Sequence, residues 1–232
     1  CSKNNKERKF QKKPPSGFTP ADLCTGTHDY WWNPDTLSLS DGDKVTSFAD
    51  SVNGLTLTEA ESNKQPTFKD SNYVWSGTGA SEKKAAAIVG NSSTSDNGLH
   101  DTVIPLKETS GVVDAVTVAC VMKDPTNSGV GQTLRMQLGV AMDTIGNRFG
   151  LDIREHKASA KYPGGSTVQT GLRYNGGILT PVLTAETGSL TFTVPELSVT
   201  KNTTFTPTSA PTTEGFIGRY PAYIGEVLIL SR

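Results

Sequence analysis

Cysteine is scarce in this chain, and its spacing indicates neither a metal site nor a disulfide framework. The three cysteines, Cys1, Cys24 and Cys120, form no Cys-x-x-Cys or Cys/His pattern of the kind that binds zinc. Cys120 lies in the apolar run Val116–Met122 and is predicted to be a small buried hydrophobe. Cys24 is able to pair with Cys1, although nothing in the sequence requires it. A fold that depends on several disulfides is therefore excluded.

Helical patterns and long apolar runs are also lacking. No stretch has helical periodicity of convincing length, and none is apolar enough for long enough to span a membrane. Aromatic residues make up only 7% of the chain, whereas 23 glycines and 13 prolines indicate many short strands joined by turns. Because all-β sandwiches often reach this size, 232 residues fit one all-β domain with an extension.

Charge is distributed unevenly along the chain. Residues 1–13 carry one acidic residue, Glu7, and a net charge of +5, whereas the whole chain has a formal net charge of −1. The basic residues of this segment are Lys3, Lys6, Arg8, Lys9, Lys12 and Lys13. With Pro14 and Pro15 following, the segment cannot bury enough apolar surface to fold by itself. We predict a basic, extended N-terminal arm over residues 1–16 and one domain over residues 17–232; the alternative is a solvated, solubilising tail.

The charge of the arm bears on its partners. Six cations with a single aromatic, Phe10, amount to a weak nonspecific electrostatic signal, so no specific nucleic acid is expected. Acidic protein surfaces would attract the arm equally well. We therefore expect contacts with other proteins or with copies of the same chain.

Several segments alternate with the period of a β-strand. Residues 45–50 and 55–58 flank Asn53-Gly54, which predicts a hairpin. Residues 112–122 are predicted to form the clearest buried strand. Residues 134–142 alternate apolar and polar side chains, and residues 147–153 are predicted to form the neighbouring strand. Pro181 and Pro195 indicate sheet edges or bulges.

Both ends of the chain carry further strand signals. Tyr30-Trp31-Trp32-Asn-Pro-Asp35 is followed by Asp41-Gly-Asp43 and Lys64-Gln-Pro-Thr-Phe68, and residues 215–230 lead through turns into an apolar closing strand. Together these segments resemble the concanavalin A-like, laminin-G-type jelly-roll domains of tailed-phage virion proteins and bacterial surface proteins. Trp31 and Trp32 are equally suited to the core of any β-domain.

The resemblance implies a two-sheet antiparallel jelly-roll sandwich with an extended N-terminal arm. It implies that the strand from Tyr30 and the strand from Ile224 are paired or adjacent, because such domains bring their ends together. Trp32, Cys120 and Val227 are expected to be buried.

Catalytic patterns are not found. Jelly-roll glycoside hydrolases use a Glu-x-Asp-x-x-Glu strand, on which alternate carboxylates share one face. The nearest acidic pair here, Asp152 and Glu155, is three residues apart and would face opposite sides of a strand, and His156 beside it is typical of a solvated turn. No Gly-x-Ser-x-Gly nucleophile elbow is present. No catalytic residue is expected.

Tyrosines in Gly/Pro-rich surroundings are the candidates for glycan binding, since sugars stack their C–H faces on exposed rings. They are Tyr162, Tyr174, Tyr220 and Tyr223. The alternative is that such a tyrosine packs beneath a loop and bonds to its backbone.

Calcium is the one cofactor that the resemblance suggests. Oxygen-rich loops occur at Asp41–Asp43 and at Asp96, Asn97 and Asp101, but each is more often an ordinary turn. No ligand set is specific enough to name as a site, and no cofactor is expected.

The preferred function is that of a noncatalytic structural or adhesion protein of a tailed-phage virion, as a head decoration, fibre or tail component. Its N-terminal arm would anchor it to other virion proteins or to copies of itself, and it would bind cell-surface glycans at most weakly. The alternatives are a secreted or lipid-anchored bacterial glycan-binding module and, third, a glycan hydrolase with an atypical site. Cys1 is consistent with either a removed initiator Met or the lipidated first residue of a bacterial lipoprotein. The corresponding locations are the phage particle and the bacterial surface or exterior.

Overall fold

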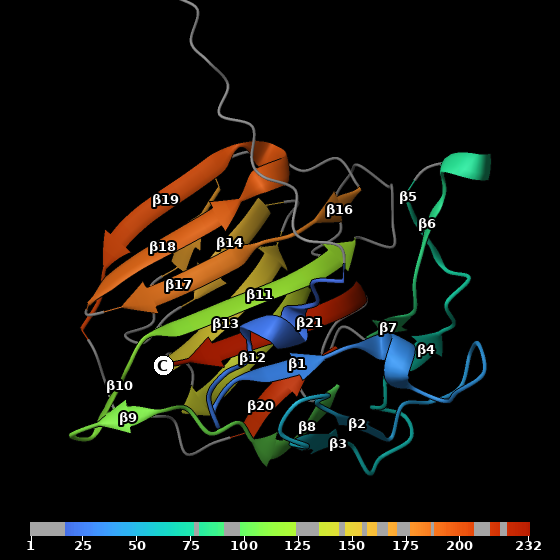
Figure 1. Ribbon diagram of the computed structural model, residues 1–232, viewed down its shortest axis with the longest axis horizontal. Coiled ribbons are helices and arrows are strands. Elements are labelled where there is room, and N and C mark those ends of the chain that lie inside the picture. The colour runs from blue at the N-terminus through green and yellow to red at the C-terminus, as the bar shows by residue number, and fades with distance from the viewer. Residues whose placement is uncertain are drawn as a thin grey trace, which may run out of the picture.

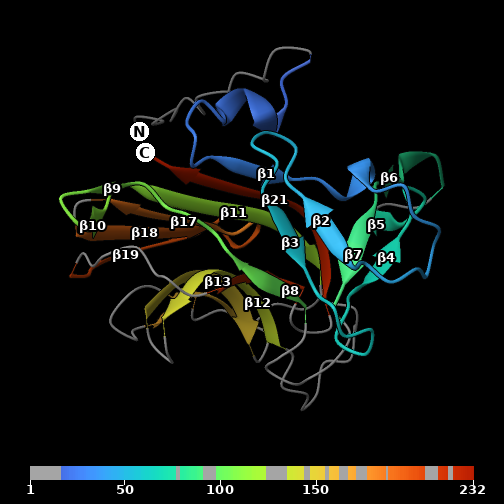
Figure 2. The same ribbon diagram turned by 90° about the horizontal axis from the view of Figure 1, so that it is seen from below.

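The protein is an antiparallel β-sandwich. A computed structural model describes residues 17–76, 79–90, 98–123, 135–143, 147–154, 157–161, 167–170, 177–186, 188–206, 214–218 and 222–232. Two sheets lie face to face, one in front of the other in Figure 1 and one above the other in Figure 2. Every strand pair in the described residues is antiparallel, as predicted for this fold class. The predicted arm, residues 1–16, lies outside the described residues.

The larger sheet has nine described strands in the order β19-β18-β17-β11-β21-β7-β4, with β1 paired to β21 and β16 to β11. They are β1 (Tyr30–Trp32), β4 (Thr67–Lys69), β7 (Ala87–Val89), β11 (Val116–Lys123), β16 (Ile178–Leu179), β17 (Val182–Glu186), β18 (Ser189–Val194), β19 (Val199–Thr204) and β21 (Tyr223–Ser231).

The second sheet has six described strands in the order β15-β14-β13-β12-β20-β8. They are β8 (Leu99–Val103), β12 (Arg135–Asp143), β13 (Asn147–Arg154), β14 (Lys157–Lys161), β15 (Thr167–Gln169) and β20 (Glu214–Ile217). The predicted pairing of residues 134–142 with residues 147–153 is confirmed as the β12–β13 pair.

Three two-stranded hairpins and four single 3-10 turns complete the described elements. The hairpins are β2 (Ser47–Ala49) with β3 (Thr56–Thr58), β5 (Val74–Ser76) with β6 (Lys83–Lys84), and β9 (Glu108–Thr109) with β10 (Val112–Val113). The turns are η1 (Pro20–Leu23), η2 (Pro34–Thr36), η3 (Gly79–Ser81) and η5 (Pro195–Leu197). Across the part of the chain described, no helix has the length and apolarity needed to cross a bilayer.

Strand β21 is the centre of the larger sheet. One of its edges pairs with β11 from Val116 to Lys123, and its other edge pairs with β1 and, nearer its start, with β7. Tyr30 lies opposite Ile229 and Trp32 opposite Val227, so the predicted pairing of the first strand with the closing strand is confirmed.

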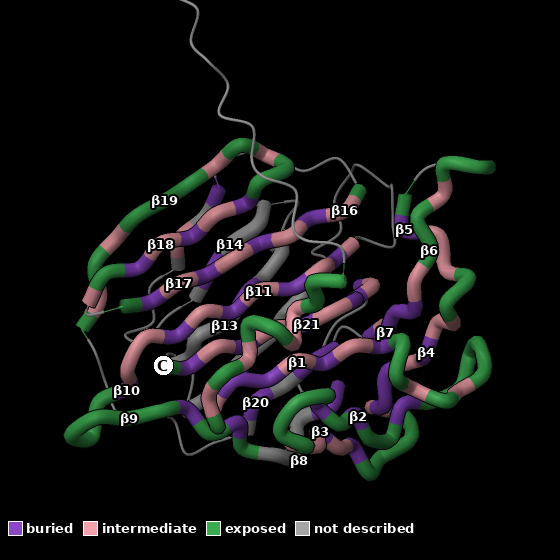
Figure 3. The backbone as a smooth tube through the Cα atoms, viewed as in Figure 1, coloured by how far each residue is buried: buried purple, intermediate pink, exposed green. Residues whose placement is uncertain are grey.

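The core lies between the two sheets. Residues of β11 alternate strictly between buried and half-buried, which is the period of a strand with one face inward (Figure 3). Trp32, Cys120 and Val227 are all buried, as predicted. Tyr30 stacks on Trp32 at 5.5 Å between ring centroids, and both rings belong to the same buried cluster.

The predicted hairpin at residues 45–58 is confirmed. Ala49 lies opposite Thr56, and Gly54 in the connecting loop has φ +75°, a left-handed conformation that glycine adopts without a Cβ clash. Phe48 is fully buried, and its carbonyl accepts a hydrogen bond from Trp32 Nε1 at 3.2 Å. The hairpin therefore joins the core of the larger sheet, and its strand β3 packs against β8 of the second sheet.

Some expectations need correction. The strand predicted over 112–122 is two strands, because Val112–Val113 turns back on β9 before β11 begins. Pro181 lies neither at an edge nor in a bulge: it separates β16 from β17, both of which pair with β11. Proline has no backbone N–H to donate, so the ladder is interrupted there. Pro195 ends β18 by beginning the turn η5.

A buried carboxylate ties the two ends of the described chain together. Asp29 precedes β1 and is fully buried, and its Oδ1 accepts a hydrogen bond from the backbone N–H of Ser231 at 2.9 Å. Its Oδ2 accepts from the N–H groups of Thr25 and Gly26, and Arg232 Nε lies 3.6 Å from the same oxygen. The carboxylate thus holds the start of β1 against the end of β21.

A second buried carboxylate organises the loop after β2. Asp50 accepts hydrogen bonds from the backbone N–H groups of Val52, Asn53 and Leu55 at 2.7 to 3.2 Å. The Asn53 side chain then donates to the carbonyl of Asp29 at 2.6 Å. The two carboxylates therefore belong to one network beneath the first strand.

This network predicts a loss of stability in alkali. Burial, with the negative charges of Asp50 and Asp29, raises the pKa of Tyr30 to about 12. Burial, with the same two carboxylates, raises the pKa of Cys24 to about 11. Both groups hold their protons more tightly in the folded protein than in the unfolded chain, where the pKa values are near 9 for Cys24 and near 10 for Tyr30. Their contribution to the free energy of unfolding is therefore complete below these unfolded pKa values and is lost as the pH rises above them.

The free energy of unfolding, measured with urea, should be level from pH 7 to about 9 and fall between about pH 9 and 12. Tyr30→Phe, which cannot ionise, should flatten the upper part of that fall, although it loses the hydrogen bond to the Pro105 carbonyl. A Tyr30→Phe profile parallel to that of the wild type would contradict the assignment.

Candidate ligand-binding site

Of the four tyrosines predicted to bind glycans, the structure describes one. Tyr223 begins β21, whereas Tyr162, Tyr174 and Tyr220 lie outside the described residues. Tyr223 is half-buried and stacks on Tyr73, with ring centroids 4.4 Å apart. Tyr73 in turn meets Trp75 edge to face at 5.4 Å. One face of the Tyr223 ring is therefore occupied by protein, and its role in glycan binding stays a prediction.

The aromatic cluster fastens the β5–β6 hairpin to the larger sheet. Lys123, on β11, donates a hydrogen bond from Nζ to the Val74 carbonyl at 3.1 Å and lies 5.3 Å from the centre of the Tyr73 ring. Trp75 is buried and donates from Nε1 to the Ala85 carbonyl at 3.1 Å, which bridges the hairpin to the chain that follows it.

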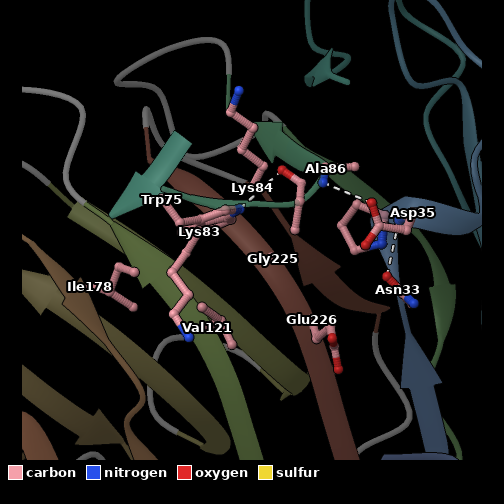
Figure 4. Close-up of a pocket in the computed structure, with 12 residues that line it drawn as sticks. Asn33, Asp35, Trp75, Lys83, Lys84, Ala86, Val121, Ile178, Gly225 and Glu226 are labelled. Carbon is pink, nitrogen blue, oxygen red and sulfur yellow. Dashed lines mark hydrogen bonds between the residues drawn. The ribbon is translucent and has the colours of Figure 1, made fainter. Parts of the chain in front are cut away.

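A pocket of about 200 Å³ lies between this hairpin, the turn η2 and the sheet (Figure 4). Its lining residues come from six separate parts of the sequence. They are Asn33, Pro34, Asp35, Trp75, Lys83, Lys84, Ala85, Ala86, Val121, Ile178, Gly225 and Glu226. Val121 and Glu226 are half-buried members of strands β11 and β21, on the side of the sheet away from the core.

Glycine at position 225 makes the pocket's shape feasible. A Cβ added to Gly225 would lie 3.0 Å from Trp75 Cζ2 and 3.3 Å from Val121 Cβ. The indole therefore rests directly on the backbone of β21. Any larger residue at this position would push the Trp75 ring and the hairpin outward.

Polar groups on one wall of the pocket are held in place by protein donors. Asn33 Oδ1 accepts from the Asp35 N–H at 3.0 Å, and Asp35 Oδ1 accepts from the Ala86 N–H at 2.8 Å. Glu226 Oε2 accepts from the indole Nε1 of Trp31 at 3.0 Å. Each of these side chains keeps a second polar atom for a ligand.

Two lysines lie at the hairpin side. Lys84 forms an ion pair with Glu82 at 2.9 Å, and its ammonium lowers the pKa of the Glu82 carboxyl. Figure 4 shows Lys83 reaching along the Val121 side of the pocket, across from Asp35 and Glu226. The pocket therefore offers an apolar middle between a cation and two anions.

The sequence did not single out this site. Asn33-Pro34-Asp35 follows the predicted first strand, and Glu226 belongs to the predicted apolar closing strand. The only signal was the Trp31-Trp32-Asn-Pro-Asp segment, which places a tryptophan and two polar side chains beside the first strand. Nothing in the sequence brings residues 33–35 to residues 83–86.

The acidic candidates can be placed only in part. Asp41 pairs with Lys69 at 3.1 Å, and Asp43 accepts from the Ser40 N–H at 2.8 Å, which are roles typical of a turn. Asp101 lies in β8, and Asp96 and Asn97 lie outside the described residues. Within the described ranges, no three His, Cys, Asp or Glu side chains form a group able to hold a metal ion.

Most of the remaining predicted residues lie outside the described part of the chain. Asp152 lies in β13, but Glu155 and His156 fall outside the described residues. The same is true of the arm residues Lys3, Lys6, Arg8, Lys9, Lys12 and Lys13. Cys24 and Cys120 are free thiols.

Fold and site together define an all-β sandwich with a small pocket on the outer face of its larger sheet. No family model matches the sequence, and no curated protein matches it.

Solved structures show only distant likeness. Trypanosoma rangeli sialidase is 11% identical over 88% of this chain and 30% of its own, with a TM-score of 0.46. The binding domain of botulinum neurotoxin serotype G is 10% identical over 82% of this chain and 48% of its own, with a TM-score of 0.46. The binding domain of botulinum neurotoxin DC, solved with rat synaptotagmin II, is 9% identical over 85% of this chain and 48% of its own, with a TM-score of 0.41. The chain spans less than half of each, and likeness this distant bears on neither activity nor ligand.

The contact between Gly225 and Trp75 yields a prediction. Gly225→Ala should lower the free energy of unfolding by about 1 to 3 kcal/mol, because overpacking forces the indole off its site. Urea titrations of Gly225→Ala, Trp75→Phe and the double variant measure the coupling. A smaller ring leaves room for the new methyl, so the double variant should lose less than the two single losses added. Strict additivity would show that the two residues do not press on each other.

Proposed function

We propose that the protein is a noncatalytic carbohydrate-binding module that holds one sugar residue in the Trp75 pocket. The observation that carries this proposal is the pocket itself, in which an amide and two carboxylates border an apolar surface of indole and aliphatic side chains. A pyranose has the complementary pattern, with hydroxyls around its rim and C–H groups on its faces. A cavity of about 200 Å³ suits one such ring.

Preorganised polar groups favour this ligand class. The Asn33 amide, Asp35 carboxylate and Glu226 carboxylate each have one atom fixed by a protein hydrogen bond, so little side-chain entropy remains to be lost on binding. The Asn33 amide group can donate to a sugar hydroxyl, and the two carboxylates can accept from adjacent hydroxyls of the same sugar. Trp75 is too buried to offer a full stacking face, so it acts as an apolar wall.

The arrangement of the carboxylates supports binding without hydrolysis. Glycoside hydrolases place two carboxyl groups on opposite sides of the scissile bond. In Figure 4, Asp35 and Glu226 lie on the same side of the pocket. Both can orient one sugar, but they do not flank a glycosidic bond.

Single-site affinity in so small a pocket would be weak, which suits display in many copies. The resemblance of the two ends of the chain to virion proteins supports a place on a tailed-phage particle as a head decoration, fibre or tail component, held there by the basic arm. A secreted or lipid-anchored bacterial glycan-binding module is the alternative, and the same pocket serves both.

A glycan array probed with a multivalent form of the protein tests the proposal. Wild-type protein should retain a defined set of glycans without releasing reducing sugar from them. Glu226→Gln keeps an acceptor for the Trp31 indole but loses the charge, and should weaken retention about tenfold, as expected for a charge-assisted hydrogen bond.

The matched control is Glu108→Gln on the exposed strand β9, none of whose residues lines the pocket, and it should bind as the wild type does. Silence of the multivalent protein on the whole array would contradict glycan binding. Release of reducing sugar from a bound glycan would contradict the noncatalytic role.

A further inference from the structure

The outer face of the larger sheet carries side chains in two straight rows across four strands. In the first row, Thr117 lies opposite Thr184, Thr184 opposite Thr191, and Thr191 opposite Asn202. The strands concerned are β11, β17, β18 and β19, which lie side by side in Figure 1. Because strands are about 4.8 Å apart, these polar groups form a regular ladder about 14 Å long.

A second row runs parallel to the first, two residues away along each strand. Ala119 lies opposite Val182, Val182 opposite Thr193, and Thr193 opposite Thr200. The row changes from aliphatic at β11 to hydroxyl-bearing at β19. All eight side chains of the two rows are half-buried or exposed.

The hydroxyls of the rows bond to one another across the strands. Thr117 and Thr184 hydroxyls lie 3.3 Å apart, as do those of Thr193 and Thr200. Thr191 donates to Asn202 Oδ1 at 3.0 Å. A hydrogen bond between two hydroxyls uses the proton of only one of them. The second hydroxyl can therefore still donate to a ligand above the sheet, and both oxygens can still accept from it.

No member of either row is charged. Lys201 lies between Thr200 and Asn202 but opposite Phe192, whose side chain enters the core, so it belongs to the other face of β19. The rows themselves are neutral, and Glu186, two residues beyond Thr184 on the same face of β17, is acidic, so the surface favours an uncharged ligand rich in hydroxyls over an anionic one. It lacks the Trp, Tyr and Arg anchors that dominate protein–protein interfaces, since threonine is under-represented in them.

The rows continue into the proposed sugar pocket. Val121, which lines the pocket, is two residues along β11 from Ala119 in the second row, and Ala119 is two residues from Thr117 in the first. Four residues of strand span about 13 Å. The open surface beyond the pocket is therefore long enough for a few sugar residues in an extended chain.

We propose that the ligand is an extended, uncharged polysaccharide, with one residue in the Trp75 pocket and the next residues lying across the threonine rows. This inference rests on the proposed function, because the pocket supplies the anchoring subsite. The rows would make affinity depend on the number of sugar residues in the ligand, which a pocket for one residue cannot do.

The experiment measures affinity by NMR titration with neutral oligosaccharides of one to six residues, using glucose and N-acetylglucosamine series. Wild-type affinity should rise with length and level off at about four residues. Thr184→Val and Thr191→Val keep the side-chain shape but remove hydroxyls. Each should weaken binding of the longest oligomer about three- to tenfold without changing that of the monosaccharide.

Thr203→Val on β19 is the matched control, because Thr203 lies opposite the core residue Leu190 on the other face of the strand. It should leave all affinities unchanged. Affinity independent of length, or insensitive to both row variants, would overturn the inference while the pocket remains a monosaccharide site. A charged oligomer, such as oligogalacturonate, binding more tightly than the neutral series would overturn it as well. If no oligomer of any length binds, the proposed function fails together with the inference.

Discussion

The hydrogen bond from the Ser231 backbone to the buried carboxylate of Asp29 joins the two ends of the described chain, and the rest of the structure depends on that closure. A buried carboxylate is costly unless its lone pairs are satisfied, and here three backbone N–H groups and Arg232 surround it. The closure places β1 beside β21. The largest buried aromatic of the core, Trp32, is thereby fixed opposite Val227.

The same closure builds one wall of the pocket on the opposite face of the strand. Trp31 points away from the core because its neighbours point inward, and its indole then holds Glu226 of β21. Asn33 and Asp35 follow immediately, where Pro34 starts the turn η2. The other wall is the β5–β6 hairpin, which rests on Gly225 through Trp75. One strand pairing therefore positions both the core and the candidate site.

The sequence was informative where burial repeats with the period of a strand. The apolar runs of β11 and β21 and the Asn53-Gly54 signal rest on local pattern, and they predicted two strands and the first hairpin. The pairing of β1 with β21 was implied only by the resemblance of the two ends of the chain. Strand β19, Val199–Thr204, was missed because an edge strand with polar side chains on both faces has no hydrophobic period. The position of Pro181 between two strands that pair with β11 could not be predicted, because the sequence does not show which strand lies opposite it.

The site was less accessible to sequence reasoning than the fold. Its polar groups come from η2, β6 and β21, and no spacing along the chain indicates that they converge. The need for glycine at position 225 comes from the Trp75 ring that packs on it, and Trp75 is too far away in the sequence to indicate that contact. Tyrosine was chosen for its chemistry, but Tyr223 uses one face of its ring to stack on Tyr73. The threonine rows became visible only through the register of four strands.

Native-state hydrogen exchange in Asp29→Ala tests the central claim most directly. If Asp29 holds the closure, the amides of β1 and of the β21 residues that pair with it should lose protection together, while those of β17 and β18 keep theirs. The matched control is Asp43→Ala, which removes an acceptor from one exposed turn and should leave all of these amides unchanged. Unchanged protection of β1 in Asp29→Ala, or an equal loss in every strand, would contradict the account.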